Sequence, residues 1–365
     1  MPDFTSASYL GLRHASRVLR PWAALTTGRP AAVRPVPGAA AMAQRLAELQ
    51  GCEAATLLPS TLHAAWDVSA LVDPRHDVLL HDAALYPILG ATVSLAATRG
   101  VGARPFASDA PGSLERALQG ARRRPVVLVD GLCPACGGPV PLRDVLAVVR
   151  RHDGLLVIDD TQAVGILGVR GGSVRAWGQV GGGSLRFHGL TGAPDVLVIA
   201  SLAKALGVPA ASVSGSAAAI AEYEARSGAR VHCSPVSSAD VRVLEHALAV
   251  NHQDGETLRR RAADAVRRWR GALGGLRVTA DGGSLPMQAL PPLRPRDAAR
   301  LHLRLARAGV LAVPQSWAGG AEGRLVFLLG ARTTAADIDA AAAALARAPD
   351  LVLLRRGATA QCEVA

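Results

Sequence analysis

Aromatic residues, cysteines and long apolar runs are all scarce in this sequence. Aromatic residues make up only 3% of the 365 residues, so the core must be built from small aliphatic side chains. Five cysteines are an odd number for a long chain, which argues against a disulfide framework and predicts buried or idle thiols. A lone CxxC at residues 133–136, without a second CxxC or a nearby histidine pair, argues against a zinc site. The N-terminus has no basic start followed by an apolar stretch, and no apolar run reaches membrane-spanning length, so we expect a cytosolic protein without a membrane segment.

Lysine is the scarcest charged residue. Of the 40 lysine and arginine residues, only Lys204 is a lysine, as expected where arginine has replaced lysine wherever a positive charge is sufficient. A desolvated amine can lose its proton near neutral pH and attack a carbonyl to form a Schiff base, whereas a guanidinium stays protonated. Lys204 is therefore the first candidate for a catalytic residue, with chance survival on a helix face as the alternative.

The positive charge of the chain has two interpretations. A net charge of +11 is typical of nucleic-acid-binding proteins, but the arginines are scattered and no basic run is interleaved with aromatic residues. We therefore expect no nucleic-acid partner. The first explanation of the net charge is a genome bias toward arginine, and the second is attraction of anionic substrates, such as phosphorylated or coenzyme A-linked molecules.

Short apolar strands alternate with helices through the first two thirds of the chain. Strands are expected at 54–58, 77–80, 126–130, 155–159, 196–200 and 211–214, and helices at 41–49, 61–71, 83–96, 114–121 and 142–151. Continuously apolar strands separated by helices predict an α/β fold with a doubly wound, mostly parallel sheet that is covered on both faces. The glycine-rich segment 165–194 is expected to be a long loop.

The pattern changes after a long helical stretch at residues 237–272. Strands are expected at 276–279, 284–290 and 324–329, and helices at 296–308 and 335–346. This predicts a smaller C-terminal α+β domain. The expected division is an N-terminal arm (1–38), a large domain (39–235), a small domain (236–350) and a tail (351–365).

Two charged side chains follow strands of the predicted parallel sheet. Asp159 ends one strand, and Lys204 lies just beyond the end of a later one. Ligands of doubly wound sheets bind at the carboxyl ends of the strands, so these groups can face one cavity. A lysine for a Schiff base and a carboxylate for a pyridinium nitrogen are the pair that pyridoxal 5'-phosphate requires.

Further residues can hold the phosphate and the ring of such a cofactor. Ser60, Thr61 and the amide of Leu62 lie where a strand leads into a helix, and a helix N-terminus binds phosphate well. Ser201 offers a second hydroxyl, and Tyr86 offers a flat face for the ring. Each of these residues alone is more often a helix cap or part of the core. It is their joint order along the chain that favours a cofactor site.

Five segments carry a resemblance to a known family. They are residues 51–55 (GCEAA), 129–131 (VDG) with 141–142 (PL), 159–162 (DDTQ), 165–168 (GILG) and 201–207 (SLAKALG). From about residue 38 to residue 346, the chain resembles the α-oxoamine synthases, a branch of the fold-type I pyridoxal phosphate-dependent transferases. The resemblance implies that Lys204 carries the cofactor, that Asp159 meets the pyridine nitrogen and that Ser201 meets the phosphate.

The chain departs from the family pattern at several of these positions. Gln162 and Tyr86 stand where the family usually has histidine, Pro134 replaces a serine, and Thr61 replaces a glycine. The arginine that usually binds the substrate carboxylate aligns with Val326, so Arg324 and Arg332 are the candidates to replace it. The cofactor site is thus expected to be intact and the amino-acid site altered.

The expected function is acyl transfer to an amino acid through a ring-stabilised carbanion. The acyl donor would be a thioester of coenzyme A or of an acyl carrier protein, and the resemblance implies a homodimer. An aminotransferase or an aldolase or lyase would use the same carbanion, and a non-catalytic partner subunit is the alternative of another class. A hydrolase of the SxxK type is disfavoured because a chain with one lysine cannot also contain the KTG motif.

Overall fold

The computed structural model describes the chain except residues 111, 135–136, 173, 175, 317–321 and 356–365. The described residues belong to two compact units. Unit 1 comprises Met1–Gly11, Cys136–Gly138 and Glu256–Ala365, and unit 2 comprises Leu12–Ala135 and Pro139–Gly255. The boundaries at 38, 235 and 350 stay a prediction.

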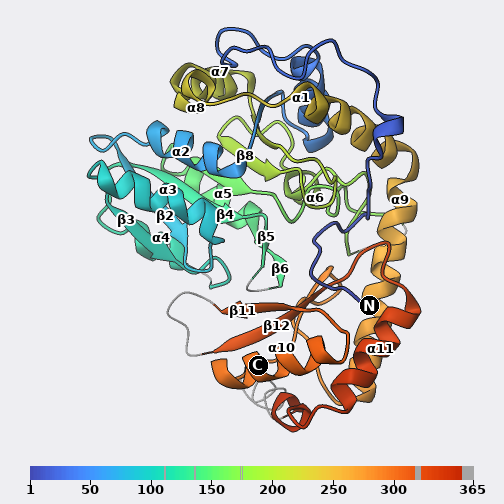
Figure 1. Cartoon of the computed structure of the whole chain (residues 1–365). Coiled ribbons are helices and arrows are strands. Elements are labelled where there is room, and N and C mark those ends of the chain that lie inside the picture. The colour runs from blue at the N-terminus through green and yellow to red at the C-terminus, as the bar shows by residue number, and fades with distance from the viewer. Residues whose placement is uncertain (111, 135–136, 173, 175, 317–321, 356–365) are drawn as a thin grey trace. The chain divides into compact units, whose positions relative to one another are not determined.

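Unit 2 contains a seven-stranded sheet with the order β1-β9-β8-β7-β4-β2-β3. Figure 1 labels β8, β4, β2 and β3 of this sheet. The pairings from β8 to β3 are parallel, and β9 runs antiparallel to both β1 and β8. The strands are β1 (Ala54–Leu58), β2 (Asp77–Asp82), β3 (Ala103–Phe106), β4 (Arg124–Asp130), β7 (Leu155–Asp159), β8 (Val196–Ser201) and β9 (Ala211–Gly215). The expected mostly parallel sheet is therefore confirmed, with one reversed strand.

Helices cover both faces of this sheet. The helices of unit 2 are η1 (Ser16–Val18), α1 (Ala39–Gln50), α2 (Thr61–Leu71), α3 (Pro87–Thr98), α4 (Ser113–Leu118), α5 (Leu142–Arg150), α6 (Ser184–His188), α7 (Ala217–Arg226) and α8 (Gly228–His232). Leu128 and Val157 pack in a cluster with α2, α3 and α7, whereas their strand neighbours Val129 and Ile158 pack with α4 and α5. Successive strand residues point to opposite faces, so continuously apolar strands are what a sheet buried on both sides needs.

Unit 1 is built on a three-stranded antiparallel sheet with the order β10-β12-β11. Its elements are β10 (Met287–Ala289), α10 (Pro295–Arg307), β11 (Val313–Ser316), β12 (Gly323–Leu328) and α11 (Ala335–Ala346). The rings of Trp269 and Phe327 lie 4.4 Å apart, and the fully buried Phe4 packs against both. The first residues of the chain, expected in an irregular arm, thus contribute to the core of this unit.

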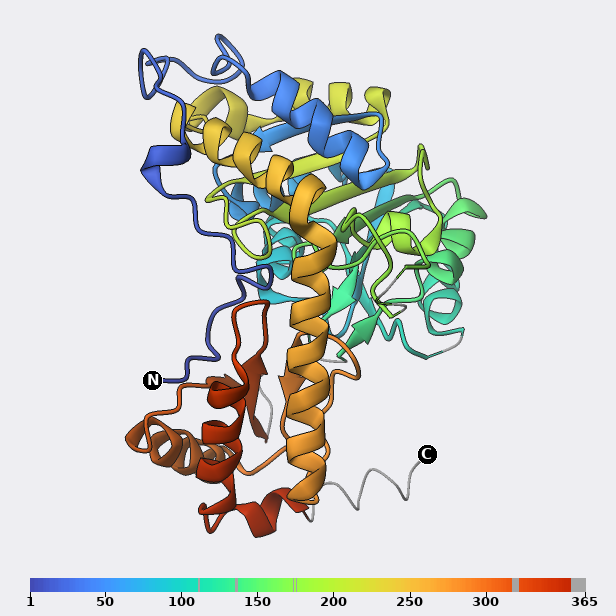
Figure 2. The ribbon, with the colours of Figure 1, turned by 90° about the vertical axis from the view of Figure 1, so that its right-hand side faces the viewer.

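The remaining elements include the longest helix. Figure 2 shows α9 (Ser238–Gly275) as one uninterrupted helix, as expected from its periodicity. The short strands β5 (Leu132–Cys133) and β6 (Gly138–Pro139) have two residues each. Among the described helices, none combines the length and the apolar character needed to cross a membrane.

Several local expectations were wrong. No strand forms at 276–279, because after α9 the chain turns through Arg277 at φ +57° and the Val278 amide bonds back to the Leu273 carbonyl at 3.0 Å. The helix expected from residue 83 begins at Pro87 because proline fits the first position of a helix. Strands β3 and β11 and helices α6, α7 and α8 were not expected. Cys133 is disulfide-bonded, which corrects the expectation of an idle thiol there, whereas Cys52 and Cys233 are free.

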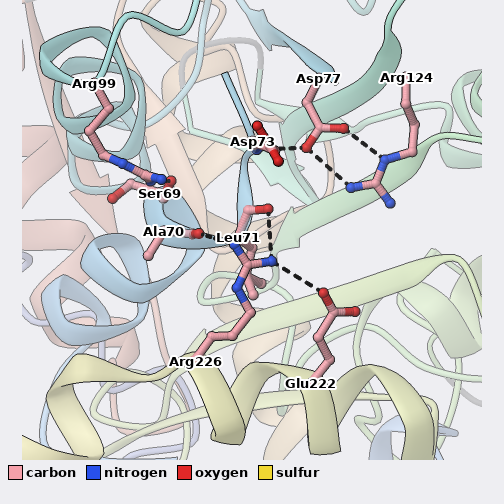
Figure 3. A network of polar contacts seen from close by, with 9 residues as sticks. All are labelled: Ser69, Ala70, Leu71, Asp73, Asp77, Arg99, Arg124, Glu222 and Arg226. Carbon is pink, nitrogen blue, oxygen red and sulfur yellow. Dashed lines mark hydrogen bonds and ion pairs between the residues drawn. The ribbon is translucent and has the colours of Figure 1, made fainter. Parts of the chain in front are cut away.

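A polar network fixes the C-terminal end of α2 (Figure 3). Arg99 donates to the Ser69 carbonyl, and Arg226 donates to the Ala70 carbonyl at 2.6 Å and the Leu71 carbonyl at 3.4 Å. These guanidinium groups satisfy carbonyls that a helix end leaves without partners. The network therefore holds the helix whose first residue, Thr61, reaches the cavity described below.

Candidate active site

A cavity of about 240 Å³ lies at the carboxyl ends of the strands of unit 2. Its lining combines residues from five segments of the chain: Thr61, Tyr86, Ile88, Asp130, Pro134, Asp159, Thr161, Gln162, Ser201 and Lys204. The carboxyl edge of a parallel sheet is where side chains from separate strands can meet. Six of the residues predicted for the cofactor site, namely Lys204, Asp159, Gln162, Ser201, Tyr86 and Thr61, are thereby brought together.

Lys204 and Asp159 are the oppositely charged pair of this cavity. Lys204 lies in the turn after β8, which the bond from the Val208 amide to the Leu202 carbonyl closes at 2.9 Å. Burial lowers the pKa of Lys204, and the charge of Asp159 opposes that shift. A half-buried amine with a lowered pKa is closer to the neutral form that attacks a carbonyl.

Asp159 is buried at the end of β7 and depends on its neighbours to carry a charge. Burial raises the pKa of Asp159, and the Thr161 side chain and amide and the charge of Lys204 offset only part of that rise. The Thr161 amide donates to Asp159 Oδ1 at 2.9 Å, and the Ser201 amide donates to Thr161 Oγ1 at 2.9 Å. Thr161 thus connects the end of β7 with the end of β8.

Asp130 is a second buried carboxyl in the cavity. It ends β4 in register with Asp159 on β7, and its Oδ2 accepts the Tyr86 amide at 3.0 Å. Burial raises the pKa of Asp130 to about 8, and the neighbouring charge of Asp159 adds to this shift. Burial thereby favours the protonated form of Asp130, whose Oδ2 fixes the backbone at Tyr86.

The start of α2 presents backbone donors beside the cavity. Thr61 is the first residue of α2 and lines the cavity, while Ser60 occupies the N-cap position without a side-chain cap bond. The Ser60 hydroxyl instead pairs with His63 Nδ1 at 2.8 Å. The first amides of α2 are therefore not capped by Ser60 and remain suited to an anion.

The other predicted residues have different surroundings. Leu62 is 52% exposed, and neither it nor Ser60 is among the described residues that line the cavity. Arg324 and Arg332 belong to unit 1, where Arg324 pairs with Asp281 at 2.6 Å and Arg332 donates to the Gly11 carbonyl. Val326 lies buried in β12. Both guanidinium groups thus have partners within their own unit.

Four lining residues were not among the predicted site residues: Ile88, Asp130, Pro134 and Thr161. Of these, Pro134 was named only as the replacement of a family serine. Asp130 ends a predicted strand, as Asp159 does. Because ligands bind at the carboxyl ends of the strands in a parallel sheet, the sequence could have indicated Asp130 as a site residue. Thr161 and Ile88 carry no such signal, because only the folded chain shows what their side chains contact.

The comparisons with known proteins agree with this geometry. Residues 12–345 match the family model described as aminotransferase class I and II. Over 228 residues, which are 59% of this chain and 54% of the relative, the chain is 35% identical to the 8-amino-7-oxononanoate synthase of Mycobacterium ulcerans strain Agy99. The chain is also 34% identical to the 8-amino-7-oxononanoate synthase of Mycobacterium bovis strain BCG / Pasteur 1173P2. This match extends over 216 residues, which are 56% of this chain and 52% of the relative. The chain spans about half the length of these relatives.

Solved structures show that the fold is shared. Serine palmitoyltransferase from Sphingomonas wittichii matches with a TM-score of 0.79 at 16% identity, covering 98% of this chain and 87% of that one. 8-Amino-7-oxononanoate synthase from Francisella tularensis matches with a TM-score of 0.71 at 16% identity, covering 94% of this chain and 96% of that one. The expected fold-type I architecture and the resemblance to the α-oxoamine synthases are confirmed.

Proposed function

The chain belongs to the aminotransferase class I and II family, and from that premise we propose that it is a pyridoxal 5'-phosphate-dependent transferase of the α-oxoamine synthase type. The observation that carries the proposal is the shared cavity of Lys204 and Asp159. When bound, pyridoxal phosphate supplies an aldehyde that bonds to amines and a ring that takes up electrons from the substrate carbon beside the nitrogen.

The side chains of the cavity fit this cofactor. Lys204 supplies an amine whose pKa burial lowers, and Asp159 supplies a carboxylate for the protonated ring nitrogen. Thr61, with the uncapped amides of α2, and Ser201 supply donors for the phosphate. Tyr86 would face the ring, and Gln162 would donate to its phenolic oxygen, in place of the histidines of the family.

The same residues perform the proton transfers of the reaction. The neutral Lys204 amine would take the proton from the α-carbon of the bound amino acid and later return one to the product. Asp159 would keep the ring nitrogen protonated, because the Thr161 amide and side chain and the charge of Lys204 favour its ionised form against the effect of burial. Asp130, neutral and bonded to the Tyr86 amide, would keep Tyr86 in place while the substrate exchanges.

The substrates are proposed to be an amino acid and an acyl thioester of coenzyme A or of an acyl carrier protein. This part rests on the relatives called 8-amino-7-oxononanoate synthase and on the neighbour called serine palmitoyltransferase. The second candidate is an aminotransferase, after which the matched family is named. A cytosolic location and a homodimer stay predictions and belong to the same proposal.

The test is to mix the pyridoxal phosphate-loaded protein with one amino acid and one acyl-coenzyme A at a time and to measure the release of free thiol. We expect release that depends on both substrates and that falls about a hundredfold or more in Lys204→Arg, since arginine keeps the charge but lacks the reactive amine. Exchange of the amino group with an oxo acid, without thiol release, would identify the aminotransferase instead. Neither reaction, across a full panel of substrates, would favour the non-catalytic partner subunit.

A further inference from the structure

Thr161 occupies the junction between the two strands that carry the charged pair. It follows β7, whose last residue is Asp159, and contacts the end of β8, three residues before Lys204. Its amide donates to Asp159 Oδ1 at 2.9 Å, and its Oγ1 accepts the Ser201 amide at 2.9 Å. One residue therefore contacts both elements on which the proposed chemistry depends.

The hydroxyl of Thr161 has one proton to give. A threonine hydroxyl has a single donor and two acceptor lone pairs, and one lone pair receives the Ser201 N–H. The proton remains available to the carboxylate of Asp159, whose ionised form the side chain of Thr161 favours. Thr161 therefore links the Ser201 amide, which its Oγ1 accepts, to Asp159 Oδ1, which its own amide contacts.

We propose that the Thr161 hydroxyl is a positioning group that fixes the Asp159 carboxylate relative to the segment bearing Ser201 and Lys204. A β-branched side chain suits this task because its χ1 angle is restricted before any ligand binds. Alanine or valine at this position would keep the amide bond to Asp159 and lose the hydroxyl that accepts the Ser201 amide.

The hydroxyl also affects the charge on Asp159. Around this carboxyl the titratable groups are Lys204 from the turn after β8, Asp130 from β4 and the adjacent Asp160. Lys204 favours the ionised form of Asp159, whereas burial disfavours it, as does each neighbouring carboxyl when it is ionised. The side chain of Thr161 also favours the ionised form of Asp159. The ring nitrogen of the cofactor needs that form as its partner.

The direct test uses hydrogen exchange of the Ser201 amide in the protein without cofactor. Thr161→Val removes the hydroxyl at nearly constant volume, and Thr161→Ser restores it. We expect the Ser201 amide to exchange about tenfold faster in Thr161→Val, the effect of losing one hydrogen bond, and to stay within about twofold of the wild type in Thr161→Ser. The amide of Ile199, inside β8, serves as the internal reference that should not change.

Two results would overturn this role. One is a Thr161→Val protein in which the Ser201 amide exchanges as slowly as in the wild type. The other is a Thr161→Ser protein that exchanges as fast as Thr161→Val, because the hydroxyl would then not be the cause. Should Thr161→Val fail to fold, Thr161→Ala makes the same comparison without a larger apolar group.

A second readout rests on the proposed function. Pyridoxal phosphate affinity should fall on acidification as Asp159 becomes protonated, and this decline should begin at higher pH in Thr161→Val and return to the wild-type position in Thr161→Ser. Coincident pH profiles of the three proteins would contradict the positioning role. A wild type that binds no pyridoxal phosphate would overturn the proposed function but leave the exchange test of the Ser201 amide standing, so the two failures can be told apart.

Discussion

Asp130 and Asp159 occupy paired positions on the neighbouring parallel strands β4 and β7, so two buried carboxyls meet at one edge of the sheet. Residues in register on adjacent strands are separated by about 5 Å, and like charges at that distance disfavour each other's ionisation. The two carboxyls differ in their partners. Asp159 has the charge of Lys204 and the amide of Thr161 beside it, whereas Asp130 receives the Tyr86 amide.

This difference predicts how stability depends on pH. Burial raises the pKa of Asp130 to about 8 in the folded state, so the folded chain holds a proton that the unfolded chain releases near pH 4. The contribution of this proton to the free energy of unfolding is complete below about pH 4. It declines as the pH rises toward 8, by at most about 1.4 kcal/mol per pH unit. Asp130→Asn has no such proton and should show a flatter decline in urea unfolding of the cofactor-free protein between pH 5 and 8. If the free energy of unfolding declined equally with pH in the wild type and in Asp130→Asn, this would contradict the raised pKa of Asp130.

Asp159→Asn tests the carboxylate itself. An amide cannot hold the positive charge of a protonated ring nitrogen, so we expect the affinity for pyridoxal phosphate to fall about tenfold or more, the effect of losing a charge-assisted hydrogen bond. The visible absorbance of the loaded protein measures this affinity. Asp153→Asn, in an exposed turn, makes the same chemical change away from the cavity and should leave the affinity unaltered.

Gly183→Ala should destabilise the unit that holds the site. Gly183 has φ +89°, and a Cβ there would lie 1.9 Å from Oδ2 of Asp160, whose carboxylate oxygens accept the Ser184 amide. We expect a loss of about 2–4 kcal/mol in the free energy of unfolding, as for steric overlap with a buried group. Gly102→Ala is the control, since an added Cβ there has nothing within 4 Å, and it should change stability by less than about 0.5 kcal/mol.

The ion pair in Figure 3 allows a comparison between a buried and an exposed carboxylate. Arg124 makes two bonds to the buried Asp77, at 2.8 and 3.2 Å. Its removal leaves that charge with one hydrogen-bond donor among the described residues, the Asp73 amide. Arg124→Leu should cost about 2–4 kcal/mol. Arg267→Leu breaks a pair with Asp264 in which both side chains are exposed, and it should cost less than about 1 kcal/mol. Similar losses for both variants in denaturant unfolding would contradict the role given to burial.

The sequence predicted the fold well where the chain is regular. Strands 54–58 and 155–159 and helices 61–71 and 335–346 have the expected bounds, because continuous apolar runs and helical spacing are local signals. β3 was not expected because its short run of residues, 103–106, has only Phe106 buried and lies at the edge of the sheet. The core role of Phe4 depends on contacts with Trp269 and Phe327 far along the chain, which no local pattern reveals.

In the candidate site, too, some residues could be predicted from the sequence, whereas others depend on contacts between distant parts of the chain. Lys204 and Asp159 were found from one scarce residue type and from strand ends, and the structure places both in one cavity. The position of Thr161 between the two strands could not be predicted, because its hydroxyl accepts a hydrogen bond from an amide 40 residues later in the chain. The hydroxyl of Ser60, expected to face a phosphate, pairs instead with His63, a contact that either position alone does not indicate.

The central claim is that Lys204 bonds covalently to pyridoxal phosphate. The most direct measurement is to load the protein with the cofactor, record the visible absorbance, reduce with borohydride and map the modified peptide by mass spectrometry. Because Lys204 is the only lysine in the sequence, a pyridoxyl group on a lysine side chain has one possible location. We predict a yellow protein with the label on Lys204, whereas a colourless protein that takes no label there would contradict the account.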